Sequence, residues 1–104
     1  MRFEFTTQQT RAVDALCRRY AVRRLALFGS AVRGDFDQLR SDLDFVVDFG
    51  PPPHNMGLVD QYFGLVDELE SLLGRTVDLV ERPAVRNPYF RKSVEDTEVG
   101  VYAA

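Results

Sequence analysis

A chain of 104 residues, of which 45% are hydrophobic and 28% charged, has the size and composition of one soluble globular domain. Its formal net charge of −3 argues against a protein that binds nucleic acid mainly through phosphate contacts, because such proteins carry a basic surplus. The single cysteine, Cys17, excludes an internal disulfide. No signal-peptide core is present, and no apolar run approaches the roughly 18 residues of a membrane span. We expect one domain over residues 1–104, a cytoplasmic location and no membrane partner.

The first third of the chain predicts a helix and then a buried strand. Thr6 and Gln9 have the spacing of a capping box at the start of a helix over residues 7–20. The apolar face of this helix is formed by Val13, Leu16, Cys17 and Tyr20. The apolar run 25–28 stops at a Gly-Ser pair, which favours a strand that ends in a tight turn. Residues 31–41 are mixed and charged and predict a loop with room for one helical turn.

The rest of the chain continues to alternate strands and helices. Gly50 and the three prolines after it end one strand, since proline cannot donate to a β-ladder, and Gly74 is a natural helix C-cap. The elements predicted here are a strand over 42–49, a helix over 57–73, a strand over 76–80, a helix over 88–96 and a short strand over 99–102. This order predicts the α/β class, with a small mixed β-sheet of three or four strands flanked by helices.

Two carboxylates mark the second predicted strand. Asp42 and Asp44 are two residues apart, so in a strand their side chains project from the same side. Two carboxylates this close repel each other unless a proton, solvent or a cation intervenes. Oxygen ligands in this arrangement suit Mg²⁺, although an acidic pair can also serve only to protect an edge strand from aggregation.

A third carboxylate, Asp78, interrupts the apolar third strand, where an unpartnered charge is unfavourable. If the third strand lies beside the second, Asp78 can join the same metal site. It could also accept a proton from an attacking hydroxyl as a general base.

The Gly-Ser pair supplies groups that can bind a phosphate. Gly29 allows the backbone to approach a phosphate closely, and Ser30 offers a hydroxyl and an N–H group. With a helical turn after it, the N–H groups of residues 30–32 would form an anion-binding end, and Arg33 could add a charged donor. Gly-Ser alone is usually only a turn, so the specific signal is the combination with the three aspartates.

That combination closely resembles the minimal nucleotidyltransferases of the polymerase-β-like superfamily. The resemblance covers nearly the whole chain and rests on residues 27–35, 41–44 and 69–80 and on Tyr102 near the end. Eleven residues separate Ser30 from Asp42, one more than the family's usual ten. The extra residue can be absorbed within residues 36–39 without moving either strand.

The resemblance implies a nucleotidyltransferase (polymerase-β-like) fold and the role of an antitoxin. Such a protein transfers AMP from ATP to a tyrosine hydroxyl of a HEPN-family ribonuclease toxin and binds that toxin, in a possible hetero-oligomer. Carried over by position, Gly29 and Ser30 would hold the triphosphate, and Asp42 and Asp44 would hold two Mg²⁺ ions. Asp78 would complete the metal site and activate the acceptor hydroxyl. The nucleotide base has no recognisable reader, so ATP is inferred from the family alone.

Two other functions remain open. The protein could neutralise its partner by occlusion without catalysis, or, less in keeping with the absence of an acceptor-binding domain, it could modify a small molecule. Four further residues have plain structural interpretations: we expect Cys17 to be a buried inert thiol, His54 to be solvated, and Tyr62 and Phe63 to belong to the core.

Overall fold

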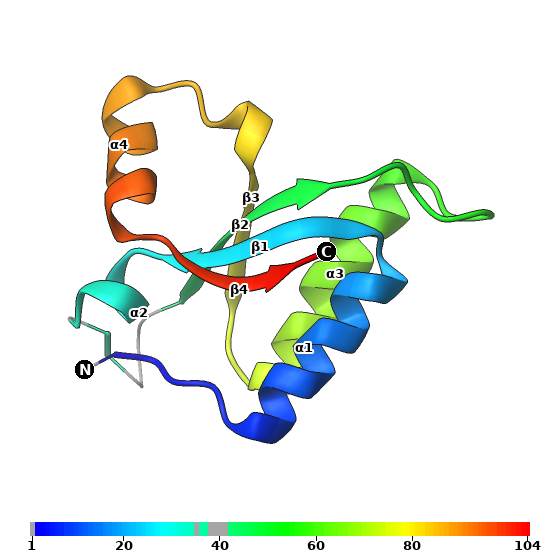
Figure 1. Ribbon diagram of the computed structural model, residues 1–104, viewed down its shortest axis with the longest axis horizontal. Helices are drawn as coiled ribbons and strands as arrows, with labels where there is room; N and C mark the ends of the chain where they lie inside the picture. Colours follow the sequence, from blue (N-terminus) through cyan, green and yellow to red (C-terminus); the bar gives the residue numbers. More distant parts are fainter. Residues whose placement is uncertain (1, 35, 38–41) are drawn as a thin grey trace.

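The computed structural model describes residues 2–34, 36–37 and 42–104, and it forms one β-sheet with helices on both faces (Figure 1). In chain order the elements are α1 (Thr7–Arg19), β1 (Val22–Phe28), α2 (Ser30–Arg33), β2 (Leu43–Phe49), α3 (Leu58–Leu73), β3 (Val77–Glu81), the 3-10 turn η1 (Arg82–Ala84), α4 (Pro88–Thr97) and β4 (Val99–Ala103). Every predicted helix and strand is present, and η1 is an addition. The loop segment 36–39, where an extra residue could be absorbed, lies partly outside the described residues.

The sheet has four strands in the order β3-β2-β1-β4. β1 is antiparallel to both of its neighbours, β2 and β4, whereas β3 is parallel to β2. The parallel pair requires a crossover connection, and α3 provides it. The expected mixed sheet and α/β class are therefore confirmed.

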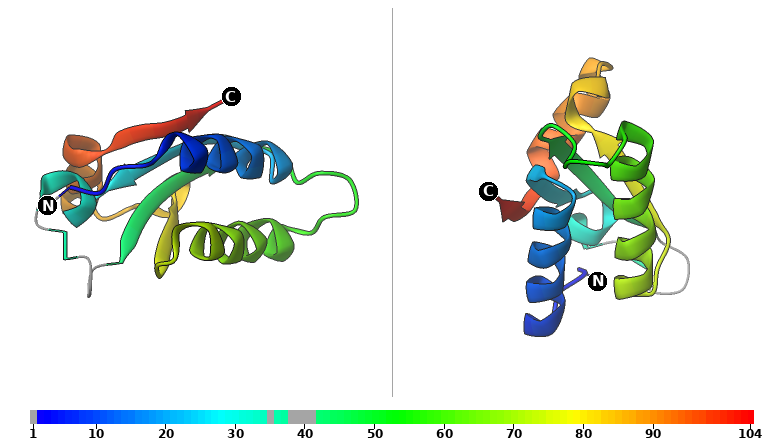
Figure 2. Two further views of the ribbon diagram at one scale, coloured as in Figure 1. Left: turned by 90° about the horizontal axis from the view of Figure 1, so that it is seen from below. Right: turned by 90° about the vertical axis from the view of Figure 1, so that its right-hand side faces the viewer.

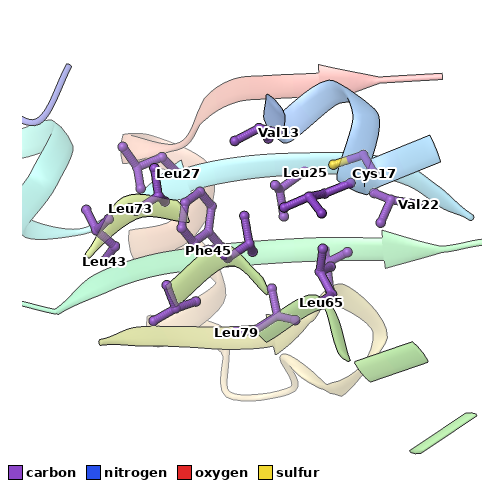
Figure 3. Close-up of a cluster of buried hydrophobic side chains, with 14 of the residues drawn as sticks. Val13, Cys17, Val22, Leu25, Leu27, Leu43, Phe45, Leu65, Leu73 and Leu79 are labelled. Atoms are coloured by element: carbon purple, nitrogen blue, oxygen red, sulfur yellow. The ribbon is translucent and has the colours of Figure 1, made fainter. Parts of the chain in front are cut away.

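Helices α1 and α3 lie side by side against one face of the sheet (Figure 2). Alternate residues of the strands point into this layer, as the period of two predicts. Figure 3 shows the resulting core, in which the fully buried side chains include Val13, Cys17, Leu25, Leu43, Phe45 and Leu65. Cys17 is buried and unpaired, as expected, and burial raises its pKa to about 12.

The opposite face of the sheet packs against α4. Its apolar cluster is small and consists of Ala26, Phe28, Val46 and Val94, with Val80 packed against it. Phe28 also meets Phe90 of α4 edge to face, with ring centroids 5.9 Å apart. Much of this face is therefore left for polar side chains.

Local signals explain where the helices begin and end. The capping box is present: the Gln9 amide donates to the Thr6 hydroxyl over 3.0 Å, and the Thr6 amide donates to the Gln9 side chain over 2.9 Å. Gly74 ends α3 with a φ of 66°, a left-handed conformation that favours glycine. Buried Gln61 links α3 to the chain just before β1 and just after β2, because its Nε2 donates to the carbonyls of Tyr20 and Gly50.

One expectation for α3 is wrong: Phe63, expected in the core, is 57% exposed. Leu58, in the first turn of the helix, is 73% exposed. Phe63 lies two residues before the buried Leu65, on the opposite side of the helix, and Tyr62 is only partly buried. His54 is exposed, as expected. Among the residues that the structure describes, no helix is long and apolar enough to cross a bilayer.

Candidate active site

Two of the three aspartates lie side by side in the sheet. β3 is the neighbour of β2, and the parallel register pairs Asp44 with Asp78. Alternation along the strands directs both carboxylates to the α4 face, because their neighbours Leu43, Phe45 and Leu79 point into the core under α1 and α3. The condition set for Asp78, that its strand lies beside the second strand, is met.

The third aspartate precedes the strand. Asp42 is exposed and comes immediately before β2, which begins at Leu43, where the amide donates to the carbonyl of Thr76 over 3.0 Å. Asp42 is therefore one residue outside the predicted strand. Its charge nevertheless acts on Asp44, so the acidic group comprises a half-buried carboxylate between two exposed ones.

Electrostatics at Asp44 reflect this crowding. Burial raises the pKa of Asp44 most, and the negative charges of Asp78 and Asp42 raise it further. The positive charge of Arg33 acts in the opposite direction and lowers the pKa. The raised pKa means that the ionised form of Asp44 is unfavourable here, and a bound cation would stabilise that ionised form.

The residues provide oxygen donors of the type that Mg²⁺ prefers. Within residues 2–34, 36–37 and 42–104, no lysine or arginine forms an ion pair with Asp42, Asp44 or Asp78. In the same part of the chain, no three acidic, histidine or cysteine side chains are gathered closely enough to hold a metal as they stand. The donor set thus fits Mg²⁺ in chemistry and charge, while the three side chains do not form a closed cage.

The turn after β1 brings the Gly-Ser pair against Asp44. Phe28 pairs with Asp44 in the sheet, and Gly29 follows it with a φ of 75° and a ψ of −144°, a conformation that is almost confined to glycine. A Cβ atom at position 29 would lie 2.7 Å from Oδ2 of Asp44. The glycine is therefore required both by its backbone conformation and by the approach of the carboxylate.

The amides of the turn are only partly available to an anion. The N–H groups of Val32 and Arg33 both donate to the Gly29 carbonyl over 3.0 Å. The expectation that the N–H groups of residues 30–32 together bind an anion therefore needs correction: Val32 is already used inside α2. Ser30 and Ala31 are the members of that set that α2 leaves for a ligand.

Two features that involve α4 carry no signal in the sequence. The Thr97 hydroxyl accepts a hydrogen bond from the Gly29 amide over 3.3 Å, although 68 residues separate them. A hollow of about 700 Å³ also lies beside β3, and Leu79, the residue after Asp78, is part of its lining together with Tyr62 and Phe90. Both depend on where α4 packs, which local patterns do not reveal.

Comparison with known sequences supports the assignment of the fold. The model of the nucleotidyltransferase domain family matches residues 10–99. Two proteins of Methanocaldococcus jannaschii, both provisionally named protein adenylyltransferases, are 38% and 40% identical over 78 residues, which is 75% of this chain and 75% and 74% of theirs. The protein adenylyltransferase MntA of Thermococcus cleftensis is 38% identical over 69 residues, covering 66% of this chain and 65% of that protein.

Solved structures agree. A structure provisionally identified as a minimal nucleotidyltransferase has a TM-score of 0.69 and 33% identity, with 88% of both chains covered. A chain of a toxin–antitoxin crystal structure with AMP-PNP has the same fold, with a TM-score of 0.66 and 21% identity over 91% of this chain and 73% of that chain. The chain therefore belongs to the nucleotidyltransferase domain family, the enzyme family that its sequence motifs resemble.

Proposed function

We propose that this protein transfers AMP from ATP to a tyrosine hydroxyl of a HEPN-family toxin and so acts as its antitoxin, in the cytoplasm. The observation that supports the proposal is the pairing of Asp44 with Asp78 beside the Gly29 turn, which brings the two carboxylates and the Gly-Ser pair to one end of the sheet. The names of the relatives support protein adenylylation. Solved toxin–antitoxin complexes of the same fold, one of them a HEPN toxin with an MNT antitoxin, support the partner.

Each site residue has a role in this proposal. Asp42, Asp44 and Asp78 would hold two Mg²⁺ ions, which would neutralise the triphosphate charge and polarise the α-phosphate. Ser30 would donate to a phosphate oxygen through its hydroxyl and amide, Gly29 would let the phosphate approach, and Arg33 would add a charge-assisted hydrogen bond.

The transfer itself uses Asp78 as the base. The acceptor oxygen attacks the α-phosphorus and its proton passes to the Asp78 carboxylate, while the bond to the β-phosphate breaks and pyrophosphate leaves. Asp78 is exposed on β3, a strand at the edge of the sheet, so a hydroxyl on another protein can reach it. The exposure of this edge favours a macromolecular acceptor.

The test removes charge without changing side-chain volume. Asp42→Asn combined with Asp44→Asn should lower the transfer of label from ATP to the toxin by about 1,000-fold or more, because transition-state charge is no longer neutralised. Asp60→Asn with Asp67→Asn, two exposed carboxylates on α3, removes the same charge away from the site and should keep full transfer. Transfer that survives in the first double variant refutes the assignment.

Neutralisation by occlusion is the second candidate. It is favoured by the exposed apolar side chains on α3, namely Leu58, Val59 and Phe63, which offer a surface for a partner. Mixing the antitoxin and the toxin without nucleotide separates the two functions. Full inhibition of the ribonuclease by the Asp42→Asn, Asp44→Asn variant would assign neutralisation to occlusion.

A further inference from the structure

Thr97, the last residue of α4, is bonded to the turn that we assign to phosphate binding. Its Oγ1 donates its only hydrogen to the carbonyl of Ser93 over 2.8 Å. Toward the Gly29 amide, 3.3 Å away, the same oxygen therefore acts only as an acceptor. The Gly29 amide can only donate, and the bond to Ser93 turns the hydroxyl hydrogen away so that a lone pair of Oγ1 faces this amide.

The end of α4 is held firmly against the sheet. Glu98, the residue after Thr97, accepts two hydrogen bonds from Arg82 over 2.7 and 3.0 Å, and Arg82 also donates to Asp48 of β2 over 3.1 Å. On the other side of Thr97, Val94 is buried against the α4 face of the sheet. Thr97 is therefore fixed relative to β2, the strand that carries Asp44.

Gly29 contacts both Thr97 of α4 and Asp44 of the candidate site. Its backbone adopts a conformation that is costly to hold, and the Asp44 carboxylate lies against its Cα. The Thr97 hydroxyl accepts from the Gly29 N–H, which belongs to the peptide between Phe28 and Gly29, and so limits rotation of that peptide. Ser30 follows directly after Gly29, so its position relative to Asp44 depends on how Gly29 is held.

We propose that Thr97 is a positioning residue of the nucleotide site, which holds the Gly29 amide so that Ser30 and Asp44 face the same triphosphate. This inference rests on the proposed function, in which that turn binds ATP. The alternative is that the Gly29 amide donates to a phosphate directly. In that case the Thr97 hydroxyl competes with ATP for the amide, and removing the hydroxyl would tighten ATP binding.

The test compares three single variants of the full chain by calorimetric titration with ATP and Mg²⁺. Thr97→Val, which keeps the shape but removes the acceptor, should weaken ATP binding by about 3- to 10-fold. Thr97→Ser should bind ATP within about twofold of the parent, because it restores the acceptor. Asp96→Asn breaks only the exposed ion pair with Lys92 and should bind ATP as the parent does.

A second measurement does not depend on the nucleotide. Hydrogen exchange of the Gly29 amide should accelerate in Thr97→Val and remain slow in Thr97→Ser. Unchanged or tighter ATP binding in Thr97→Val, unchanged exchange at Gly29, or failure of Thr97→Ser to restore binding would each overturn the inference. A parent protein that binds no ATP would instead refute the proposed function.

Discussion

The two faces of the sheet differ in what they are packed with. Under α1 and α3, strands β1 and β2 present Leu25, Phe45 and Val47, all fully buried. Under α4, β2 presents Asp44 and Asp48 on either side of Val46. The same strand thus contributes a dry core to one face and charged groups to the other.

This division shows how a domain of 104 residues can carry an unfavourable cluster of charge. Carboxylates that lie near one another and are partly buried lower stability unless a cation joins them. The raised pKa of Asp44 is the sign of that cost. The apolar face offsets it, and the following predictions test how far the two faces are independent.

The largest expected effect is on the apolar face. Phe45→Ala should lower the free energy of unfolding by about 3–5 kcal/mol, because it opens a cavity under two helices. Val94→Ala, its counterpart on the α4 face, should cost about 1–2 kcal/mol, since a smaller group is lost from a smaller cluster. Urea unfolding measures both losses. Equal losses would mean that α4 contributes as much to the core as α1 and α3.

Gly29→Ala should have the next largest effect and should act on both folding and the site. The positive φ and the approach of Asp44 Oδ2 should cost about 1–3 kcal/mol in unfolding free energy. ATP binding should weaken at the same time, because the Asp44 carboxylate must move. Gly100→Ala, where an added Cβ meets nothing within 4 Å, is the control on β4. A normal affinity for ATP in Gly29→Ala would separate the turn from the site.

Arg82→Met tests the support of the α4 face. Arg82 is partly buried between Asp48 and Glu98, whose acceptor oxygens raise its pKa, with the Glu98 hydrogen bond the largest contribution. Removing the guanidinium should cost about 1–2 kcal/mol, because Glu98 loses both of the hydrogen bonds that it accepts from Arg82. Adding Glu98→Gln should restore part of the loss in a double-mutant cycle measured by urea unfolding. Simple additivity would show that the pair does not interact.

The smallest effect should be a gain in stability. Asp44→Asn removes a carboxylate whose pKa is raised by burial and by the charges of Asp78 and Asp42. At pH 7 the free energy of unfolding of the variant should therefore exceed that of the parent by roughly 0.5 kcal/mol, a figure that allows for solvent screening. The folded parent binds a proton more readily than the unfolded chain does. Its stability therefore falls as the pH rises from the ordinary value of 3.8 through the raised pKa, and the gain in the variant should vanish below that window.

The midpoint of thermal unfolding, measured from pH 3 to 8, checks this sign. Asp67→Asn, an exposed carboxylate on α3, should show no comparable gain at pH 7. Added Mg²⁺ should stabilise the parent more than Asp44→Asn. A loss of stability in Asp44→Asn at pH 7 would contradict the electrostatic account of the site.

Much of the fold could be predicted because its signals are local. The capping box at Thr6, the glycine that ends α3 and the prolines after β2 each act within a few residues, so the elements follow from the order of the amino acids. Where the structure differs, the reason is packing. Phe63 is apolar, yet it lies two residues from both Gln61 and Leu65, on the side of α3 opposite to the buried face, and is left exposed.

The sequence by itself determined the α/β class, the elements, the Gly-Ser turn and the presence of three aspartates, because period-two and helical patterns depend on neighbours in the chain. Only the tertiary structure decided that Asp44 and Asp78 share a register, that Asp42 lies just outside the strand, and that Thr97 meets Gly29. These contacts join residues far apart in the sequence. They depend on how α3 crosses over the sheet and on where α4 packs. The positions of both helices follow from burying the apolar side chains of a whole sheet face, which no single segment of the sequence specifies.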